Sequence, residues 1–84
     1  LIEHAREHKH SRASSIIRRV ILGLYNSHAW PMDLRSMQHL DDENRRDVLR
    51  LIDLQCRPFA TEIQDRIRGG ERVIEEFEEL ERDS

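Results

Sequence analysis

The segment Ile16–Leu40 most constrains what this chain can fold into, because it joins a dense apolar stretch to an Asn turn and a Trp-Pro dipeptide. Its apolar residues recur every three or four positions, which is the period of an α-helix. A residue that precedes proline is pushed away from helical angles. We therefore expect a helix over 12–25 with Ser11 as N-cap and Ser14 or Ser15 as alternatives, then a loop through Pro31. The stripe consists of Ala13, Ile16, Ile17, Val20, Ile21 and Leu24, and Leu22 lies off it beside Arg18.

The rest of the chain also shows helical spacing and no strand alternation. Asp33 is the expected cap of a short helix through Gln38, and Asp41 or Asp42 the cap of a helix over about 43–56. Two further helices are expected over about 59–68 and 71–82. Gly69-Gly70 should break or kink the path between them, since two glycines cost a helix about 2 kcal/mol. The predicted fold class is all-α, a compact bundle of four to five short helices.

The predicted interior draws on several of these helices. One core is expected from Ile17, Val20, Ile21, Leu24, Leu49, Ile52 and Phe77. Trp30 should pack over the helix ends and anchor the loop, because an aromatic between two amphipathic helices gains from burial. Other residues expected to face inward are Leu34, Met37, Leu40, Val48, Cys56, Phe59, Ile63, Ile67, Val73, Ile74 and Leu80.

The length of 84 residues allows one domain. Residues 1–10 are polar and contain three histidines, so we expect there an N-terminal segment that is either a frayed tail or an extra helical turn, and a single helical domain over 11–84. Charged residues make up 37% of the chain, against about 25% in ordinary domains. The core is therefore small for the number of charges, and a second copy or another protein could complete it.

The single cysteine, Cys56, excludes an internal disulfide and fits a reducing, cytoplasmic setting. A small buried thiol is its expected state. No apolar run approaches the roughly 18–20 residues that a membrane span needs, so no membrane role is expected. The first ten residues do not resemble a signal peptide.

Motifs that could carry chemistry are few. His4, Glu7 and His8 follow the H-x-x-E-H order of inverted zincin metalloproteases. A zinc site needs a third ligand and a neighbouring cleft, and this motif is expected to precede the folded body. We predict no metal site, no cofactor, no catalytic residue and no enzymatic activity.

Thirteen of the fourteen basic residues are arginine, which is enriched at protein interfaces. Three sites, Arg18-Arg19, Arg45-Arg46 and Arg50, could form a basic patch, and 33–56 bears a faint similarity to a helix-turn-helix. Acidic residues are interleaved with these arginines, and the last 42 residues carry a net charge of −4, which repels phosphate backbones. The predicted interaction surface consists of Arg18, Arg19, Leu22, Trp30, Arg45, Arg46 and Arg50.

Several local motifs recur together in a group of sequences that this chain resembles. The matching pieces are Ser11, Ile16–Leu24, Tyr25-Asn26, Met32-Asp33-Leu34, Leu40-Asp41 and Gly69-Gly70-Glu71. On these pieces the chain resembles short, uncharacterised proteobacterial helical domains associated with plasmids and integrating elements. Met32 stands where Phe is more usual, and glycines expected near Ala29 are missing. The resemblance implies a bacterial mobile element as genomic context and carries no activity.

The function expected from these observations is a non-enzymatic protein-interaction or accessory module. Its partner is expected to be a protein, with a second copy of the chain as one candidate. Two alternatives remain open at this point. One is a small nucleic-acid-associated regulator, and the other is a phage- or element-encoded inhibitor of a host protein.

Overall fold

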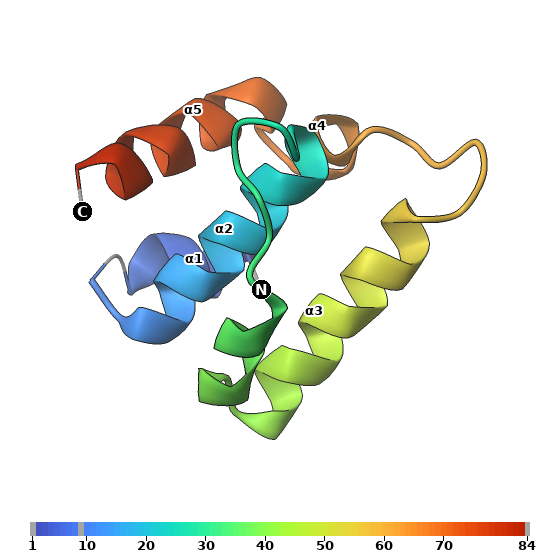
Figure 1. Ribbon diagram of the computed structural model, residues 1–84. Coiled ribbons are helices and arrows are strands. Elements are labelled where there is room, and N and C mark those ends of the chain that lie inside the picture. The colour runs from blue at the N-terminus through green and yellow to red at the C-terminus, as the bar shows by residue number, and fades with distance from the viewer. Residues whose placement is uncertain (1, 9, 84) are drawn as a thin grey trace.

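The computed structural model describes residues 2–8 and 10–83, and within these ranges every regular element is a helix (Figure 1). The all-α prediction is confirmed. The elements are α1 (Ile2–Glu7), α2 (Arg12–Tyr25), the 3-10 helix η1 (Leu34–His39), α3 (Asp42–Gln55), α4 (Ile63–Arg66) and α5 (Gly70–Arg82).

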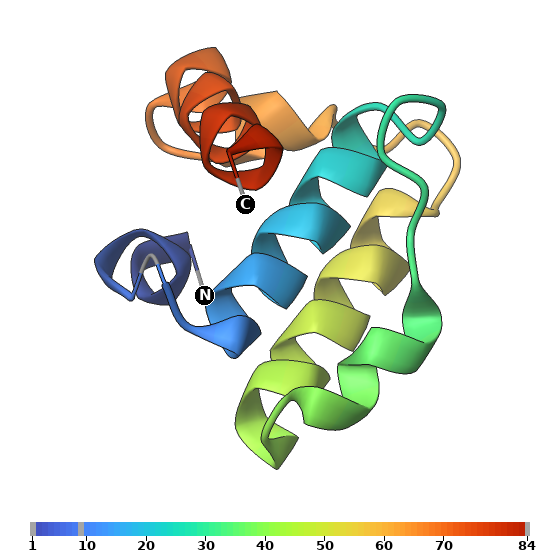
Figure 2. The ribbon, with the colours of Figure 1, turned by 60° about the vertical axis from the view of Figure 1, so that its left-hand side comes forward.

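Helix α2 lies at the centre, with α1 and α5 on one side and η1 and α3 on the other (Figure 2). This position explains why α2 is apolar on more than one face. Leu22 is fully buried, so its predicted place on the interaction surface is wrong. A helix with neighbours on both sides has almost no solvent face along its middle turns.

The predicted N-caps are confirmed at three helix starts. Ser11 Oγ accepts a hydrogen bond from the amide of Ser14 at 3.0 Å. Asp33 accepts from Arg35 N at 3.1 Å, and Asp41 accepts from Asn44 N at 2.7 Å. Each cap satisfies a backbone N–H that has no partner within its own helix.

The buried core draws on every helix. Its largest fully buried side chain is Phe77 of α5, which lies with residues of α2. Leu24, Trp30 and Ile52 are half-buried and pack against this core. The buried apolar set is Ala5, Ile16, Ile17, Val20, Ile21, Leu22, Met37, Leu40, Val48, Ile63, Ile67, Val73, Ile74 and Phe77.

Helix α3 is the main departure from the predicted core. Val48 is its only fully buried residue, whereas Leu49 is 52% exposed and Cys56, just after the helix, is also exposed. The inward placements of Leu49 and Cys56 are therefore wrong. Leu34 of η1, which is 63% exposed, was misplaced in the same way. The physical reason is that α3 packs on the body along one narrow side only (Figure 2).

The helix predicted over 59–68 is reduced to α4, a single turn from Ile63 to Arg66. Phe59 is fully exposed on a backbone with φ of 62°, so its inward placement is wrong. The segment after Pro58 forms turns instead, in which Ala60 N donates to Arg57 O at 3.2 Å. A left-handed residue cannot continue a right-handed helix, so the helical path is interrupted here.

The N-terminal segment belongs to the packed body. Helix α1 packs against α2, Ala5 is fully buried, and Arg6 forms an ion pair with Glu76 of α5 at 3.2 Å. The expectation that the His4–His8 motif precedes the folded body is therefore wrong. Residues 1, 9 and 84 lie outside the described ranges.

The predicted break at Gly69-Gly70 is confirmed, because α4 ends at Arg66 and α5 begins at Gly70. Both glycines have positive φ, 93° at Gly69 and 48° at Gly70. A Cβ on Gly70 would lie 3.1 Å from the carbonyl oxygen of Gln64.

Replacing Gly70 with alanine should lower the free energy of unfolding by about 1–2 kcal/mol, because L-residues are strained at positive φ. Urea denaturation followed by circular dichroism measures the change. Glu71→Ala, in the next position of the same helix, is the control and should change stability by about 0.5 kcal/mol or less. Equal losses in the two variants would contradict the assigned backbone conformation.

Within residues 2–8 and 10–83, no helix combines the length and the apolar character needed to cross a lipid bilayer.

Candidate functional site

A carboxylate and a guanidinium meet inside the protein where α5 packs against α2. Arg18 Nε donates to Glu81 Oε2 at 2.9 Å, and both side chains are almost completely buried. Arg18 Nη1 also donates to the carbonyl of Ala5 at 3.1 Å, which joins α1 to the pair. Such partners are required, because an unpaired ion in the interior has lost its hydration. Arg18 is an internal residue, so its predicted place on the interaction surface is wrong.

The second oxygen of Glu81 is also occupied. Oε1 accepts from Ser15 Oγ at 2.8 Å and from Arg19 Nε at 2.7 Å. Ser15, Arg18 and Arg19 are three and four residues apart, so they lie on one face of α2. Glu81 thus joins one turn of α2 to the end of α5, and the arrangement is a structural clamp rather than an acid–base pair.

Trp30 anchors the loop after α2, as predicted. Its Nε1 donates to Glu78 Oε2 at 3.2 Å, and the side chain packs on the core. The guanidinium carbons of Arg19 and Arg82 each lie 5.9 Å from the centre of the Trp30 ring. Cations at this distance are attracted to the face of an indole. The structure therefore brings two predicted surface residues, Arg19 and Trp30, to one edge beside α5.

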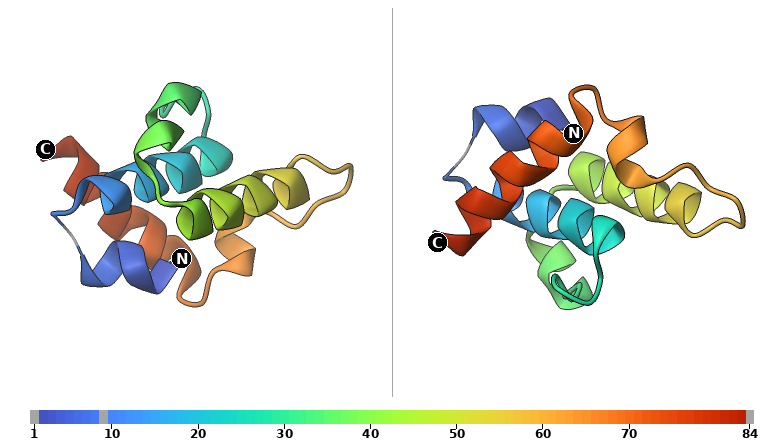
Figure 3. Two further views of the ribbon diagram at one scale, coloured as in Figure 1. Left: turned by 90° about the horizontal axis from the view of Figure 1, so that it is seen from below. Right: turned by 90° about the horizontal axis from the view of Figure 1, so that it is seen from above.

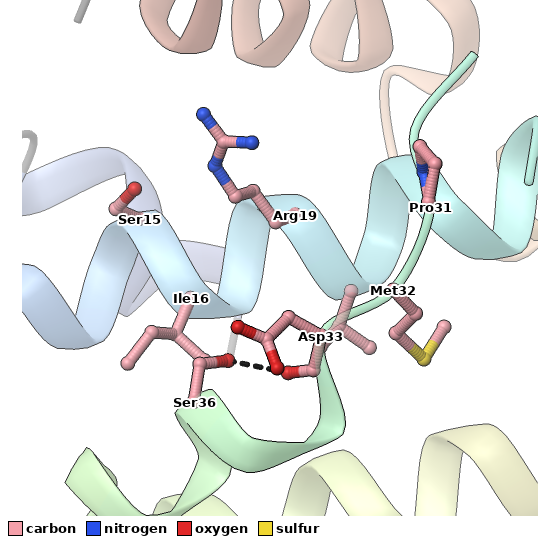
Figure 4. Close-up of a pocket in the computed structure, with 8 residues that line it drawn as sticks. Ser15, Ile16, Arg19, Pro31, Met32, Asp33 and Ser36 are labelled. Atoms are coloured by element: carbon pink, nitrogen blue, oxygen red, sulfur yellow. Dashed lines mark hydrogen bonds between the residues drawn. The ribbon is translucent and has the colours of Figure 1, made fainter.

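A cavity of about 280 Å³ lies between α2 and the start of η1 (Figure 4). Its polar lining is already engaged, since Ser36 Oγ donates to the carbonyl of Asp33 at 2.7 Å and Ser15 Oγ donates to Glu81. The guanidinium of Arg19 points toward α5 rather than into the cavity (Figure 4). These polar groups serve local structure and leave no nucleophile paired with a base.

The other predicted arginines lie on α3, on the far side of α2 from α5 (Figure 2). Arg45 forms an ion pair with Asp42. Arg46 and Arg50 are exposed, and neither has an ion pair with another residue in the described ranges. The predicted surface is therefore divided into an edge with Arg19 and Trp30 and a separate face on α3, while Leu22 and Arg18 are internal.

The histidine motif on α1 does not assemble a metal site in the described part of the chain. The rings of His4 and His8 lie 4.7 Å apart between centroids. No group of three or more His, Cys, Asp or Glu residues that could hold a metal ion occurs within 2–8 and 10–83. The Nε2 atom of His4 is buried and has no hydrogen-bond partner among the described residues. The ring of His8 packs close to the ring of His4.

Sequence reasoning missed Glu81, although a signal was present. Glu81 follows Ile74 and Phe77 by seven and four positions, so it falls on the apolar stripe of α5. A carboxylate on such a stripe is buried only when it is paired. Arg18, an arginine among the apolar residues of α2, was the matching signal.

The comparisons with known proteins give a family without an assigned function. A family model described as "Family of unknown function (DUF7673)" matches residues 1–82. No curated protein and no solved structure matches the chain. The family match spans nearly the whole sequence, so the chain belongs to the DUF7673 family.

Proposed function

We propose that this member of the DUF7673 family is a non-enzymatic protein-interaction module that binds its partner on the outer side of α3 and the turn that follows. Phe59 is the observation that carries the proposal. Its aromatic side chain is fully exposed, and its backbone has a φ of 62°. The left-handed backbone costs about 1–2 kcal/mol, and burial of the ring against a partner would contribute about 2 kcal/mol.

The apolar side of α3 extends the surface around Phe59. Leu49 and Cys56 are seven residues apart, so they lie on the same side of the helical path, and both are exposed. Leu51, Ile52 and Leu54 are only half-buried. A helix that leaves this many apolar side chains uncovered by its own chain supports a role in binding.

The charge of α3 favours a protein over a nucleic acid. The helix carries four acidic residues against three arginines, which gives a net charge of −1. A surface that tracks a phosphate backbone needs an excess of positive charge. Arginines mixed with carboxylates and apolar residues are instead common at protein interfaces.

A second copy of the chain is the partner that the charges fit best. Arg46 and Arg50 of α3 are exposed and four residues apart, and so are Glu75 and Glu79 of α5. None of the four has an ion pair within the described ranges. Two pairs with equal spacing can meet across an interface, where complementary charge fixes orientation and speeds association.

The setting that we propose is the bacterial cytoplasm, with the gene carried on a mobile element. The resemblance of the segment Ser11–Leu40 to plasmid-associated proteobacterial domains supports the mobile element, and the single cysteine supports a reducing compartment. The genes that flank family members test the origin. Neighbours of recombination or plasmid maintenance are expected, and housekeeping neighbours throughout would contradict it.

A charge swap tests self-association directly. Sedimentation velocity from about 10 µM to about 1 mM should show the mass of the wild type rising with concentration. Phe59→Ser should keep the protein monomeric. Arg46→Glu with Arg50→Glu should do the same, and adding Glu75→Arg with Glu79→Arg should restore association, because the charges match again.

Leu34→Ser is the matched control, since it changes another exposed apolar residue that lies off α3. It should leave association unchanged. A wild type that stays monomeric at about 1 mM would contradict self-association. A photo-crosslinker placed at position 59 should then capture a host protein that the same group at position 34 does not. Failure of both assays, together with a shift of a DNA or RNA probe, would overturn the proposed function in favour of a nucleic-acid regulator.

A further inference from the structure

Three arginines that have no carboxylate partner among the described residues lie around one cavity, outside α3. The cavity has a volume of about 520 Å³ and lies where α1 meets the link between α4 and α5. Figure 3 shows α1 beside the start of α5 in both views. The lining residues are Ile2, Glu3, Arg6, Arg66, Ile67, Arg68, Gly69, Arg72 and Val73.

The glycine turn gathers these arginines. Arg66 ends α4, Arg68 lies in the link, and Arg72 is in the first turn of α5. The positive φ values of Gly69 and Gly70 reverse the chain between them, so all three side chains line one cavity. In a straight helix, residues two apart would face different directions.

Charge in the cavity is strongly unbalanced. Four arginines and one acidic residue, Glu3, are among the residues that line it. Arg6 has Glu76 as an ion-pair partner at 3.2 Å, but Arg66, Arg68 and Arg72 have none among the described residues. This occurs in a chain whose net charge is −3, where carboxylates outnumber arginines. Like charges held close together repel one another, and an anion between them relieves that repulsion.

We propose that this cavity binds a small phosphate ester or anhydride that carries an apolar or aromatic body. A phosphate group brings a charge of about −1.5 to −2 and three acceptor oxygens, which guanidinium forks bind in a bidentate manner. The apolar residues of the lining are Ile2, Ile67 and Val73, of which the half-buried Ile2 offers the most accessible surface to the body of the ligand. The volume lies in the range of about 300–1,000 Å³ that is usual for small-molecule sites.

The site is independent of the docking surface on α3, and the two have separate tests. The probe is ADP, added to the chain of 84 residues and followed by amide chemical shifts in NMR spectra. Saturable shifts are expected at residues 66–73 and in α1. Pyrophosphate should bind about tenfold more weakly and adenosine more weakly still, because each supplies one half of the proposed ligand.

Two variants separate binding from folding. Arg68→Gln with Arg72→Gln should weaken ADP binding at least about tenfold, and both residues are exposed, so the fold should persist. Glu3→Gln should strengthen binding about fivefold, because it removes the one carboxylate that faces the anion. A merely structural defect would not strengthen binding.

Arg12→Gln with Arg35→Gln is the matched control, because these arginines are exposed, have no ion pair among the described residues, and lie outside both the cavity and α3. It should leave ADP binding unchanged. Non-saturable shifts spread over all arginines, or equal losses in the two double variants, would overturn the proposal. Tighter binding of citrate than of ADP would overturn the assignment to a phosphate.

Discussion

Replacing Glu81 with glutamine should lower the free energy of unfolding by about 3–5 kcal/mol. Glutamine keeps the size of the side chain but leaves the buried guanidinium of Arg18 without its counter-charge. The hydrogen bonds from Ser15 and Arg19 also converge on Glu81. Because small domains are stable by only about 5–15 kcal/mol, the variant should be largely unfolded at moderate urea concentrations.

Glu79→Gln is the control for Glu81→Gln, since it removes an exposed carboxylate from the same helix. Its effect should stay within about 0.5 kcal/mol. Urea denaturation followed by far-ultraviolet circular dichroism measures both. If the two variants lost the same stability, Glu81 would not be paired in the interior.

A double variant separates the ion pair from packing. Arg18→Met with Glu81→Leu should recover most of the stability that Glu81→Gln loses, because an apolar pair of similar volume needs no counter-charge. Arg19 would lose its partner as well, but its side chain is half exposed and water can solvate it. The stability losses of Arg18→Met alone and of Glu81→Leu alone should add up to more than the loss of the double variant. If they summed to the loss of the double variant, the two residues would not be coupled.

The second large effect is the difference in lost stability between two leucine-to-alanine substitutions, at Leu22 and at Leu49. Leu22→Ala should lower the free energy of unfolding by about 3–5 kcal/mol, because Leu22 is fully buried and its removal leaves a cavity. Leu49→Ala should cost less than about 1 kcal/mol, since Leu49 is 52% exposed. Periodicity alone predicts the reverse order for these two positions.

Thermal and urea denaturation of both leucine variants checks this order. Leu49 lies on the proposed docking surface of α3. A small loss for Leu49→Ala would therefore also show that a substitution on this surface leaves the fold intact. Equal losses at positions 22 and 49 would place Leu49 in the core, and that result would contradict the arrangement of α3 in the structure.

The local features of this protein could be predicted from the sequence. Ser11, Asp33 and Asp41 cap helices because their side chains reach a free amide two or three residues onward, and that geometry depends on neighbours alone. The break at Gly69-Gly70 follows in the same way, because glycine is the residue that tolerates positive φ at no steric cost. The all-α class and the anchoring role of Trp30 also followed from spacing.

Tertiary structure alone decided which faces of these helices are inside. Leu22 is buried and Leu49 exposed because α2 has neighbours on both sides whereas α3 has them on one. The period of a helix gives the spacing of its apolar residues. It does not say how much of the helix surface other elements cover, so it predicts neither fact. The internal position of Arg18 depended on Glu81, 63 residues later in the chain. Long-range contacts of this kind arise only when the helices pack. They also bring the arginines together around the cavity beside α1, so tertiary structure determines where the candidate sites lie.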